Sequence, residues 1–398
     1  MLKCPKDLVQ QVGNVLFSLF LLVLMLDPGN AILHLKDKFF ILFLGYNLLF
    51  LKPDLRFLLP IFTVFALLFF GFIMGNVQGN PIDLTYMSGV FKGVSPLVLL
   101  LWVKHYDVLK LARIPALITC VVILILYGFI VSSDAIQYAV FLYSKQHNEM
   151  VMITTRNLLG IKFFGMYYRS IVSIIPILFC VLFTAFSPSH KRKRHFFFAI
   201  ILTATFFISG TRAMMLTPLF VIGILLFNKF SQYPKGKYLL YPLLISGVFA
   251  FLLLIFLLAT QEGDASNTVK YGHLASYARL FNEHPQYLLW GQGTGSTFYS
   301  EGFNAVTAET EWIYLELLRN FGVLSLFILG VYFFPLYIFF RHRQDKFTAG
   351  FGLCYFGFLL IAGTNPFLLN SQGMTVLWMV YSHAYHVSKA SESCQMLK

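Results

Sequence analysis

Apolar residues gather along the chain in long runs that short polar segments interrupt. A helix needs about 20 residues to cross the hydrocarbon of a bilayer, and the runs divide into twelve units of roughly that kind. They are centred on residues 12–27, 38–51, 57–75, 86–103, 114–132, 170–187, 195–209, 213–228, 239–260, 312–340, 347–363 and 372–387. The second and seventh runs are short enough to tilt, merge or re-enter. The pattern predicts an all-α polytopic membrane protein of about twelve transmembrane helices, with residues 1–398 forming a single integral-membrane bundle.

The composition agrees with this class. Only 12% of the 398 residues are charged and 58% are hydrophobic, whereas soluble domains carry about 25% charged residues. The net charge of +13 comes from Lys and Arg clustered between apolar runs, which indicates membrane topology and predicts no nucleic-acid partner. The five cysteines form no CxxC pair and have no histidine cluster nearby, so we expect no disulfide framework, no metal site and no cofactor.

The distribution of Lys and Arg predicts which loops face the cytoplasm. With a cytoplasmic N-terminus, 19 of the 30 basic residues fall in the inside segments, as the positive-inside rule requires. Both termini are then cytoplasmic in a multi-pass protein of the plasma membrane. Lys3 and Lys6 before the first apolar run resemble a signal peptide, but Asp27-Pro28-Gly29-Asn30 offers no cleavage site, so we interpret the run as an uncleaved first span.

This topology leaves two long loops on the outer face, residues 132–169 and, between spans nine and ten, residues 261–311. Loops beyond about 12–15 residues are usually functional or disordered, and the aromatic and charged residues in these two predict that they are folded and functional. The glycine-rich stretch 291–295 follows no strand of a βαβ unit. It therefore indicates a loop and is a weak motif for phosphate. The chain has no Walker A loop and no pair of similar halves with broken helices, which disfavours a transporter.

Three polar stretches stand at the rim of the predicted spans, where charge is costly. In the first, Ser209-Gly210-Thr211-Arg212 turns between two apolar runs. Arg212 either reaches lipid headgroups or binds a phosphate bidentately. The second contains Arg279, Glu283, His284 and Pro285. It predicts a short amphipathic helix on the membrane surface that breaks at the proline, with a possible i,i+4 ion pair between Arg279 and Glu283.

The third stretch runs from Ala308 to Gly322 and contains three carboxylates. The i,i+3 spacing predicts that Glu316 pairs with Arg319. Glu311 stands where the long loop becomes helix, so it either favours the helix N-terminus or serves as a catalytic carboxylate at the membrane rim.

Together these stretches resemble the bacterial O-antigen polymerase and O-antigen ligase superfamily of membrane glycosyltransferases. The resemblance covers residues 208–330 and the twelve-span outline with one large outer loop. Glu311-Trp312, followed after nine residues by Gly322, has the spacing of the ligase motif, but a glutamate replaces the histidine that is proposed as catalytic in ligases. The chain therefore looks more like the polymerase branch. Arg212 and Arg279 are similar to the two functional arginines of the family.

The resemblance implies glycosyl transfer from undecaprenyl diphosphate to a sugar hydroxyl. Arg212 and Arg279 would stabilise the diphosphate leaving group without a metal, and Glu311 would be the general base if partial burial raised its pKa. Direct displacement would invert the anomeric configuration. We expect substrate contacts from a further set of residues, namely Arg156, Arg169, His284, Glu309 and Tyr314.

The leading hypothesis is a repeat-unit polymerase for O-antigen or a similar polysaccharide, acting on the periplasmic side of the bacterial inner membrane in lipopolysaccharide biosynthesis. Its partners would be the undecaprenyl-diphosphate-linked oligosaccharide, membrane lipid and, as the resemblance implies, a chain-length regulator. The alternatives are an O-antigen ligase that acts on lipid A core, a lipid-linked oligosaccharide flippase or polysaccharide transporter, and a non-catalytic scaffold.

Overall fold

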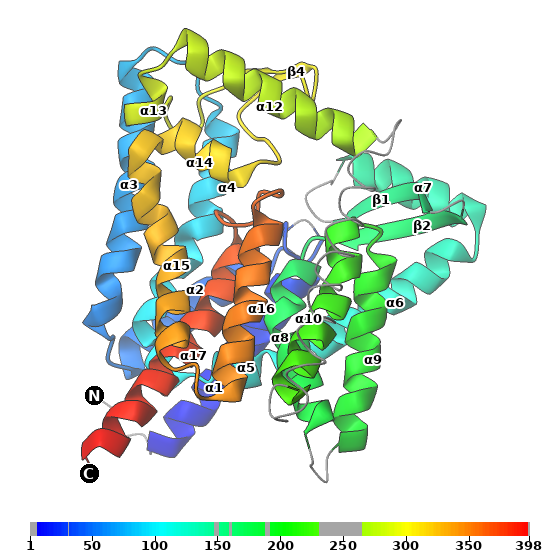
Figure 1. The fold of residues 1–398 in the computed structure, drawn as a ribbon, viewed down its shortest axis with the longest axis vertical. Helices are drawn as coiled ribbons and strands as arrows, with labels where there is room; N and C mark the ends of the chain where they lie inside the picture. Colours follow the sequence, from blue (N-terminus) through cyan, green and yellow to red (C-terminus); the bar gives the residue numbers. More distant parts are fainter. Residues whose placement is uncertain are drawn as a thin grey trace.

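The chain folds as a helical bundle with a layer of shorter elements over one end (Figure 1). The computed structural model describes residues 6–30, 32–146, 151–158, 161–187, 192–230 and 265–396. The first half holds α1 (Lys6–Leu26), α2 (Lys36–Phe50), α3 (Leu58–Val77), α4 (Leu84–Val94), α5 (Val108–Leu111), α6 (Arg113–Val131) and α7 (Asp134–Gln146). The second half holds α8 (Ile171–Phe186), α9 (Arg192–Ile208), α10 (Arg212–Phe230), α12 (Ala265–Glu283), α13 (Tyr287–Trp290), α14 (Ile313–Phe321), α15 (Ser325–Arg341), α16 (Lys346–Ala362) and α17 (Ser371–Met396).

Most of the predicted spans are helices. Among the described residues, six helical segments are long and apolar enough to cross a membrane, and Arg212–Phe227 and Lys346–Ala362 are shorter apolar helices. The run at 239–260 lies outside the described residues, and the count of twelve spans stays a prediction. Two runs are not single α-helices. The run at 86–103 passes from α4 into the 3₁₀ helix η2 (Ser95–His105), and the run at 312–340 divides into α14 and α15 around the 3₁₀ turn η3 (Gly322–Leu324).

The core of the bundle surrounds α8, which packs against α9, α10, α16 and α17. Nearly every side chain of α8 is buried, as expected of a helix that is apolar on all sides. The aromatic side chains of Phe179, Phe347 and Phe351 pack together on its α16 side. This packing places α10 and α16 around one central helix.

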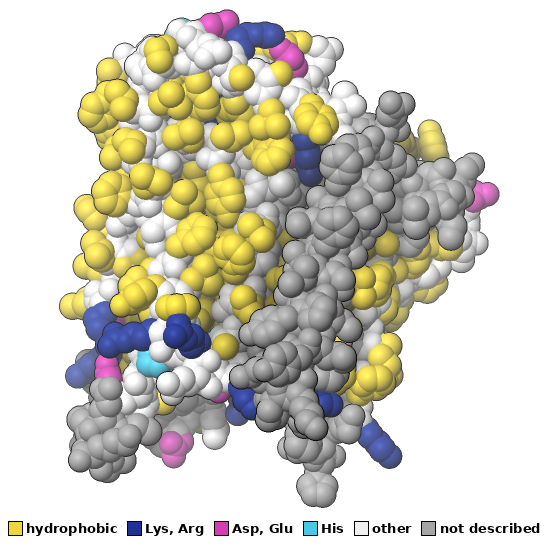
Figure 2. Space-filling view, viewed as in Figure 1, with side chains coloured by type: hydrophobic (Ala, Val, Ile, Leu, Met, Phe, Trp, Pro, Cys, Tyr) yellow, Lys and Arg dark blue, Asp and Glu magenta, His cyan; other side chains and the backbone are white. Residues whose placement is uncertain are grey.

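The outer surface carries an apolar belt between two charged rims. Figure 2 shows hydrophobic side chains over the α3 and α15 face, with Lys and Arg gathered below them and both acidic and basic residues above. Leu59, Phe62 and Phe69 on α3 and Leu326 and Phe334 on α15 are exposed. A belt of this kind suits contact with lipid, and we conclude that the protein is an integral membrane protein.

The two ends of the described chain lie together at one end of the bundle, opposite α12 (Figure 1). An even number of crossings, as predicted, requires both termini to lie on the same side of the membrane. The assignment of that side to the cytoplasm stays a prediction from the charge pattern.

Both predicted outer loops are folded, and both contain strands, so the fold is not purely α-helical. The described part of residues 132–169 holds α7 and an antiparallel pair of strands, β1 (Val151–Leu158) and β2 (Ile161–Tyr168), in a register that pairs Val151 with Tyr168. The described part of residues 261–311 holds α12, α13 and a smaller hairpin of β3 (Phe298–Ser300) and β4 (Ala305–Thr307). In Figure 1, α12 lies crosswise over the end of the bundle.

Candidate functional site at the α12 end of the bundle

Arg212 reaches α12 from the turn between α9 and α10. Gly210 has φ of +66°, a value that an L side chain adopts with strain, and this residue lets the chain reverse within Ser209-Gly210-Thr211. The Oγ of Ser209 donates a 2.7 Å hydrogen bond to the carbonyl oxygen of Phe206 and closes the turn. The Nη1 of Arg212 then donates to the Oδ1 of Asn267 on α12 at 3.3 Å. The predicted hairpin is therefore present, and its arginine faces the outer layer.

Lys270 joins α12 to the segment that carries Glu311. The Nζ of Lys270 lies 3.9 Å from the Oε2 of Glu311, and the two side chains are 29% and 32% exposed. The Nε1 of Trp312 donates to the carbonyl oxygen of Lys270 at 3.1 Å. Because Asn267 and Lys270 are three residues apart on one helix, they lie on the same face. Arg212, Lys270 and Glu311 therefore meet along one side of α12.

Glu309 makes the second ion pair of this region. Its Oε1 lies 4.0 Å from the Nη2 of Arg169, which follows β2 at the start of α8. Two predicted substrate-binding residues from the two different outer loops are thus brought together. Glu309 and Glu311 are two residues apart between β4 and α14, and each carboxylate faces a different cation.

Thr310, between these two carboxylates, turns into the protein core. Its backbone N–H donates to the Oε2 of Glu316 at 2.8 Å, and its Oγ1 lies 2.6 Å from the hydroxyl of Tyr277. Glu316 also accepts a hydrogen bond from the hydroxyl of Tyr86. Burial raises the pKa of Tyr277 well above its usual range, so this hydroxyl keeps its proton. Thr310 is buried, whereas the side chains of Glu309 and Glu311 on either side of it are 41% and 32% exposed.

The predicted ion pair between Glu316 and Arg319 is wrong. Both side chains are buried, but neither makes a salt bridge with the other among the described residues. Arg319 instead donates to the Oε1 of Gln292 at 2.8 Å and to the carbonyl oxygens of Ser296 and Ala308 at 2.6 Å each. Its guanidinium carbon also lies 4.7 Å from the ring centre of Phe298, a cation–π contact. Arg319 therefore holds the outer loop onto α14.

The glycine-rich stretch has a packing role. Gly293 has φ of +108°, and a Cβ built on it would lie 2.4 Å from the Cα of Gly75. A Cβ on Gly71 would lie 2.3 Å from the Oγ1 of Thr294. Gly71 and Gly75 form a small-xxx-small face on α3, which allows a close backbone approach. Gly293 is seated in that face, whereas Gly291 packs against the backbone of Asn320 and Phe321.

Arg279 and His284 lie toward the other end of α12. Arg279 pairs with Glu301 in the β3–β4 turn, and its side chain is 57% exposed; the predicted pair with Glu283 is absent among the described ion pairs. α12 ends at Glu283, as Pro285 predicts, and exposed His284 stacks with Tyr287 at 5.0 Å between ring centres. Twelve residues of helix separate Asn267 from Arg279, which is about 18 Å along the axis. Among the described contacts, none brings Arg212 and Arg279 together: Arg212 contacts Asn267 and Arg279 contacts Glu301.

Two further predicted residues have different outcomes. The hydroxyl of Tyr314 donates to the carbonyl oxygen of Leu359 at 2.6 Å, so it ties α14 to α16. Arg156 lies in β1 opposite Phe163, and its side chain lies outside the described set. A substrate role for either stays a prediction.

Lys270 and Asn267 are the site residues that sequence reasoning missed. Their three-residue spacing was the only local signal, and nothing in it points to Glu311.

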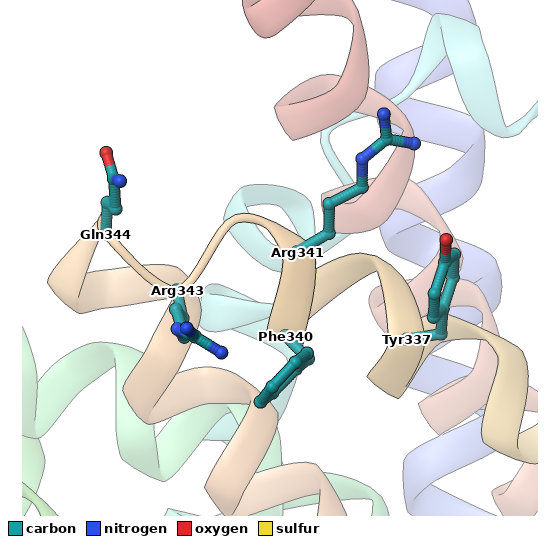
Figure 3. Close-up of a pocket in the computed structure, with 5 residues that line it drawn as sticks. All are labelled: Tyr337, Phe340, Arg341, Arg343 and Gln344. Carbon is teal, nitrogen blue, oxygen red and sulfur yellow. The ribbon is translucent and has the colours of Figure 1, made fainter.

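A shallow hollow elsewhere on the surface, lined by Tyr337, Phe340, Arg341, Arg343 and Gln344, lies at the C-terminal end of α15 (Figure 3). Since α15 leads away from α14 toward the opposite rim (Figure 1), this hollow is not part of the candidate site.

Within the part of the chain that the structure describes, no three His, Cys, Asp or Glu residues gather as a metal site would require. Comparisons with protein-family models, curated proteins and solved structures found no match.

Proposed function

We propose that the protein is a membrane glycosyltransferase that polymerises lipid-linked repeat units of O-antigen or a similar bacterial polysaccharide. One observation carries the proposal: two cations and a carboxylate meet at the rim of an apolar bundle. Glu311 pairs with Lys270 on α12, and Arg212 donates a hydrogen bond to Asn267, which lies about one turn before Lys270 on the same helix. This arrangement combines a carboxylate with two cations where a lipid-borne diphosphate would reach the protein. A second support is the order of Arg212 and Glu311 along the chain, which resembles that of the functional residues in the O-antigen polymerase and ligase superfamily.

The chemistry follows from these charges. The hydroxyl oxygen of the acceptor sugar attacks C1 of the donor sugar, and the bond from C1 to the phosphate oxygen breaks with both electrons going to the diphosphate. Glu311 takes the hydroxyl proton as general base. Arg212 faces the negative charge that grows on the leaving diphosphate. Displacement from the opposite side inverts the anomeric configuration.

The location of Arg279 changes its role in the proposal. Because this residue is exposed and paired with Glu301 at the distal half of α12, we assign it to the approach of the glycan and leave the diphosphate to Arg212. Glu309 replaces His284 as the second candidate base, since Glu309 lies two residues from Glu311 whereas His284 lies beyond the far end of α12.

Two alternatives are weaker. An O-antigen ligase of the resembled kind would carry a histidine at the position of Glu311. A flippase needs charge in a central cavity at mid-membrane, whereas the ion pairs of Glu309 and Glu311 lie in the outer layer at the end of the bundle.

The test is polymerisation by the purified protein in detergent, supplied with lipid-linked repeat units from the same bacterium and with EDTA. Wild type is compared with Glu311→Gln, Arg212→Ala and the matched control Glu283→Gln, which alters an exposed carboxylate at the end of α12. We expect a glycan ladder from wild type and from Glu283→Gln and none from the other two, at unchanged melting temperature.

A ladder that persists in Glu311→Gln would remove Glu311 as the base and move that role to Glu309. Loss of the ladder with EDTA in wild type would overturn the metal-free reaction. No ladder from wild type, together with transfer of lipid-linked sugar across proteoliposome membranes, would favour the flippase.

A further inference from the structure

Two long ion pairs join cations to the outer carboxylates. The Lys270–Glu311 and Arg169–Glu309 pairs have N···O distances of 3.9 and 4.0 Å, and all four side chains keep part of their surface in contact with solvent. Exposed pairs of this kind contribute little to stability. Lys270 is nevertheless fixed in place, because its backbone carbonyl accepts the indole N–H of Trp312.

We propose that Lys270 and Arg212 together bind a lipid diphosphate, as a clamp of two cations. Glu311 pairs with Lys270 until the diphosphate displaces the carboxylate. This inference rests on the proposed function and names its donor-binding residues. Arg212 is fixed at Asn267, and the Cβ atoms of Asn267 and Lys270 are about 5–6 Å apart by their helical spacing. Both cations therefore contact the same part of α12 and its neighbour Glu311.

The exchange follows from charge. A diphosphate ester carries at least two negative charges and Glu311 carries one, so the ligand interacts more strongly with the ammonium of Lys270. When the ligand takes Lys270, Glu311 loses its neighbouring positive charge and gains a neighbouring anion. Both changes make a carboxylate more basic. The donor lipid would thus activate the base that its own transfer reaction requires, and Glu311 would be a weak base while the donor site is empty.

Binding of farnesyl diphosphate to the full-length protein in detergent, measured by native mass spectrometry, tests this without any turnover. Lys270→Met should weaken binding about tenfold, as loss of one charge-assisted phosphate contact implies, and Lys270→Arg should restore it. Glu311→Gln should tighten binding about two- to fivefold, because a competing exposed ion pair of modest strength is removed. Glu283→Gln should leave binding unchanged. Melting temperatures confirm that each variant is folded.

The ligand series identifies what the clamp binds. Farnesyl monophosphate should bind at least about tenfold more weakly than the diphosphate, since it engages one cation only. Equal binding of the two lipids would overturn the two-cation clamp, and so would unchanged affinity in Lys270→Met. Unchanged or weaker binding in Glu311→Gln would overturn the exchange.

These results separate from those on the proposed function. If the affinities change as expected and the wild-type protein gives no glycan ladder, the diphosphate clamp is supported and the polymerase function is contradicted. If the ladder depends on Glu311 while Glu311→Gln leaves the affinity for farnesyl diphosphate unchanged, the polymerase function is supported and the exchange at Lys270 is contradicted.

Discussion

The indole N–H of Trp312 donates a 3.1 Å hydrogen bond to the backbone carbonyl oxygen of Lys270, and the ammonium of the same lysine faces Glu311, the neighbour of Trp312 in sequence. Adjacent residues of one segment therefore hold both the main chain and the side chain of Lys270. The contact from Trp312 is neutral and does not compete with an anion, so it maintains the position of α12 when the ion pair opens.

Removing the indole donor tests this division of roles. Trp312→Phe should lower the free energy of unfolding by about 1 kcal/mol, the usual net value of one hydrogen bond, and reduce polymerisation more than it reduces thermal stability. Exposed Trp290 provides the matched control, and Trp290→Phe should leave both properties unchanged. Melting temperature and ladder length measured on the same preparations check the prediction. Equal effects of the two substitutions would contradict it.

Thr310 should be sensitive to loss of its hydroxyl alone. Thr310→Val keeps the shape and the backbone N–H bond to Glu316, but it removes the hydroxyl that lies 2.6 Å from the Tyr277 hydroxyl and 3.4 Å from the Oε2 of Glu316. An unsatisfied buried polar group costs about 1–3 kcal/mol, so we expect a lower melting temperature. The double variant Thr310→Val with Tyr277→Phe should recover part of the loss, because no orphaned hydroxyl remains. No recovery would show that the contact between Thr310 and Tyr277 is not the cause.

Gly293 should not tolerate a side chain. Its left-handed backbone costs about 1–2 kcal/mol for other residues, and the added methyl group would overlap the backbone of Gly75. Gly293→Ala should therefore yield little folded protein in size-exclusion chromatography. Gly330→Ala on α15, where a Cβ meets nothing within 4 Å, should elute like wild type. A wild-type elution peak from Gly293→Ala would contradict the seating of the loop on α3.

Buried His273 should make the outer layer sensitive to acid. Its Nδ1 lies 2.7 Å from the Oγ of Ser300, and its ring packs against Phe303. Burial lowers the pKa of His273 below its usual value of about 6.5, so the folded protein favours the neutral ring. The unfolded chain binds the proton more readily, and the contribution of His273 to stability is complete above about pH 6.5 and is lost as the pH falls through the folded-state value.

Melting curves between pH 7.5 and pH 5 check this direction. The melting temperature of wild type should fall on acidification, and His273→Gln should show a smaller fall. Exposed His284 serves as the control, since His284→Gln should keep the full dependence. A pH dependence that is identical in wild type and His273→Gln would refute the role of this histidine.

Hydropathy predicted the long helices well because a bilayer demands long apolar segments. The run at 57–75 corresponds to α3 and the run at 114–132 to α6. The C-terminal run was placed at 372–387, whereas α17 continues to Met396. Hydropathy locates the apolar part of a helix, and polar residues can continue the same helix beyond it.

The contacts of the site were harder to predict because they depend on tertiary packing. Glu316 and Arg319 have the spacing of a helical ion pair, yet each is buried and finds its partners elsewhere, Arg319 in the outer loop and Glu316 at Thr310 and at Tyr86 on α4. Lys270 is distant from Glu311 in sequence, and only the crosswise placement of α12 brings them together. Residues 132–169 were predicted to be folded, but loop length and composition gave no signal for the strands β1 and β2 within them.

The seat of Gly293 on Gly71 and Gly75 is matched by a second main-chain contact, between α12 and the β3–β4 turn. A Cβ on Gly302 in that turn would lie 2.3 Å from the carbonyl oxygen of Val269, the residue before Lys270 on α12. Main-chain atoms in such direct contact leave no room for a larger side chain. The outer layer is therefore joined to α3 and to α12 by contacts that do not depend on charge.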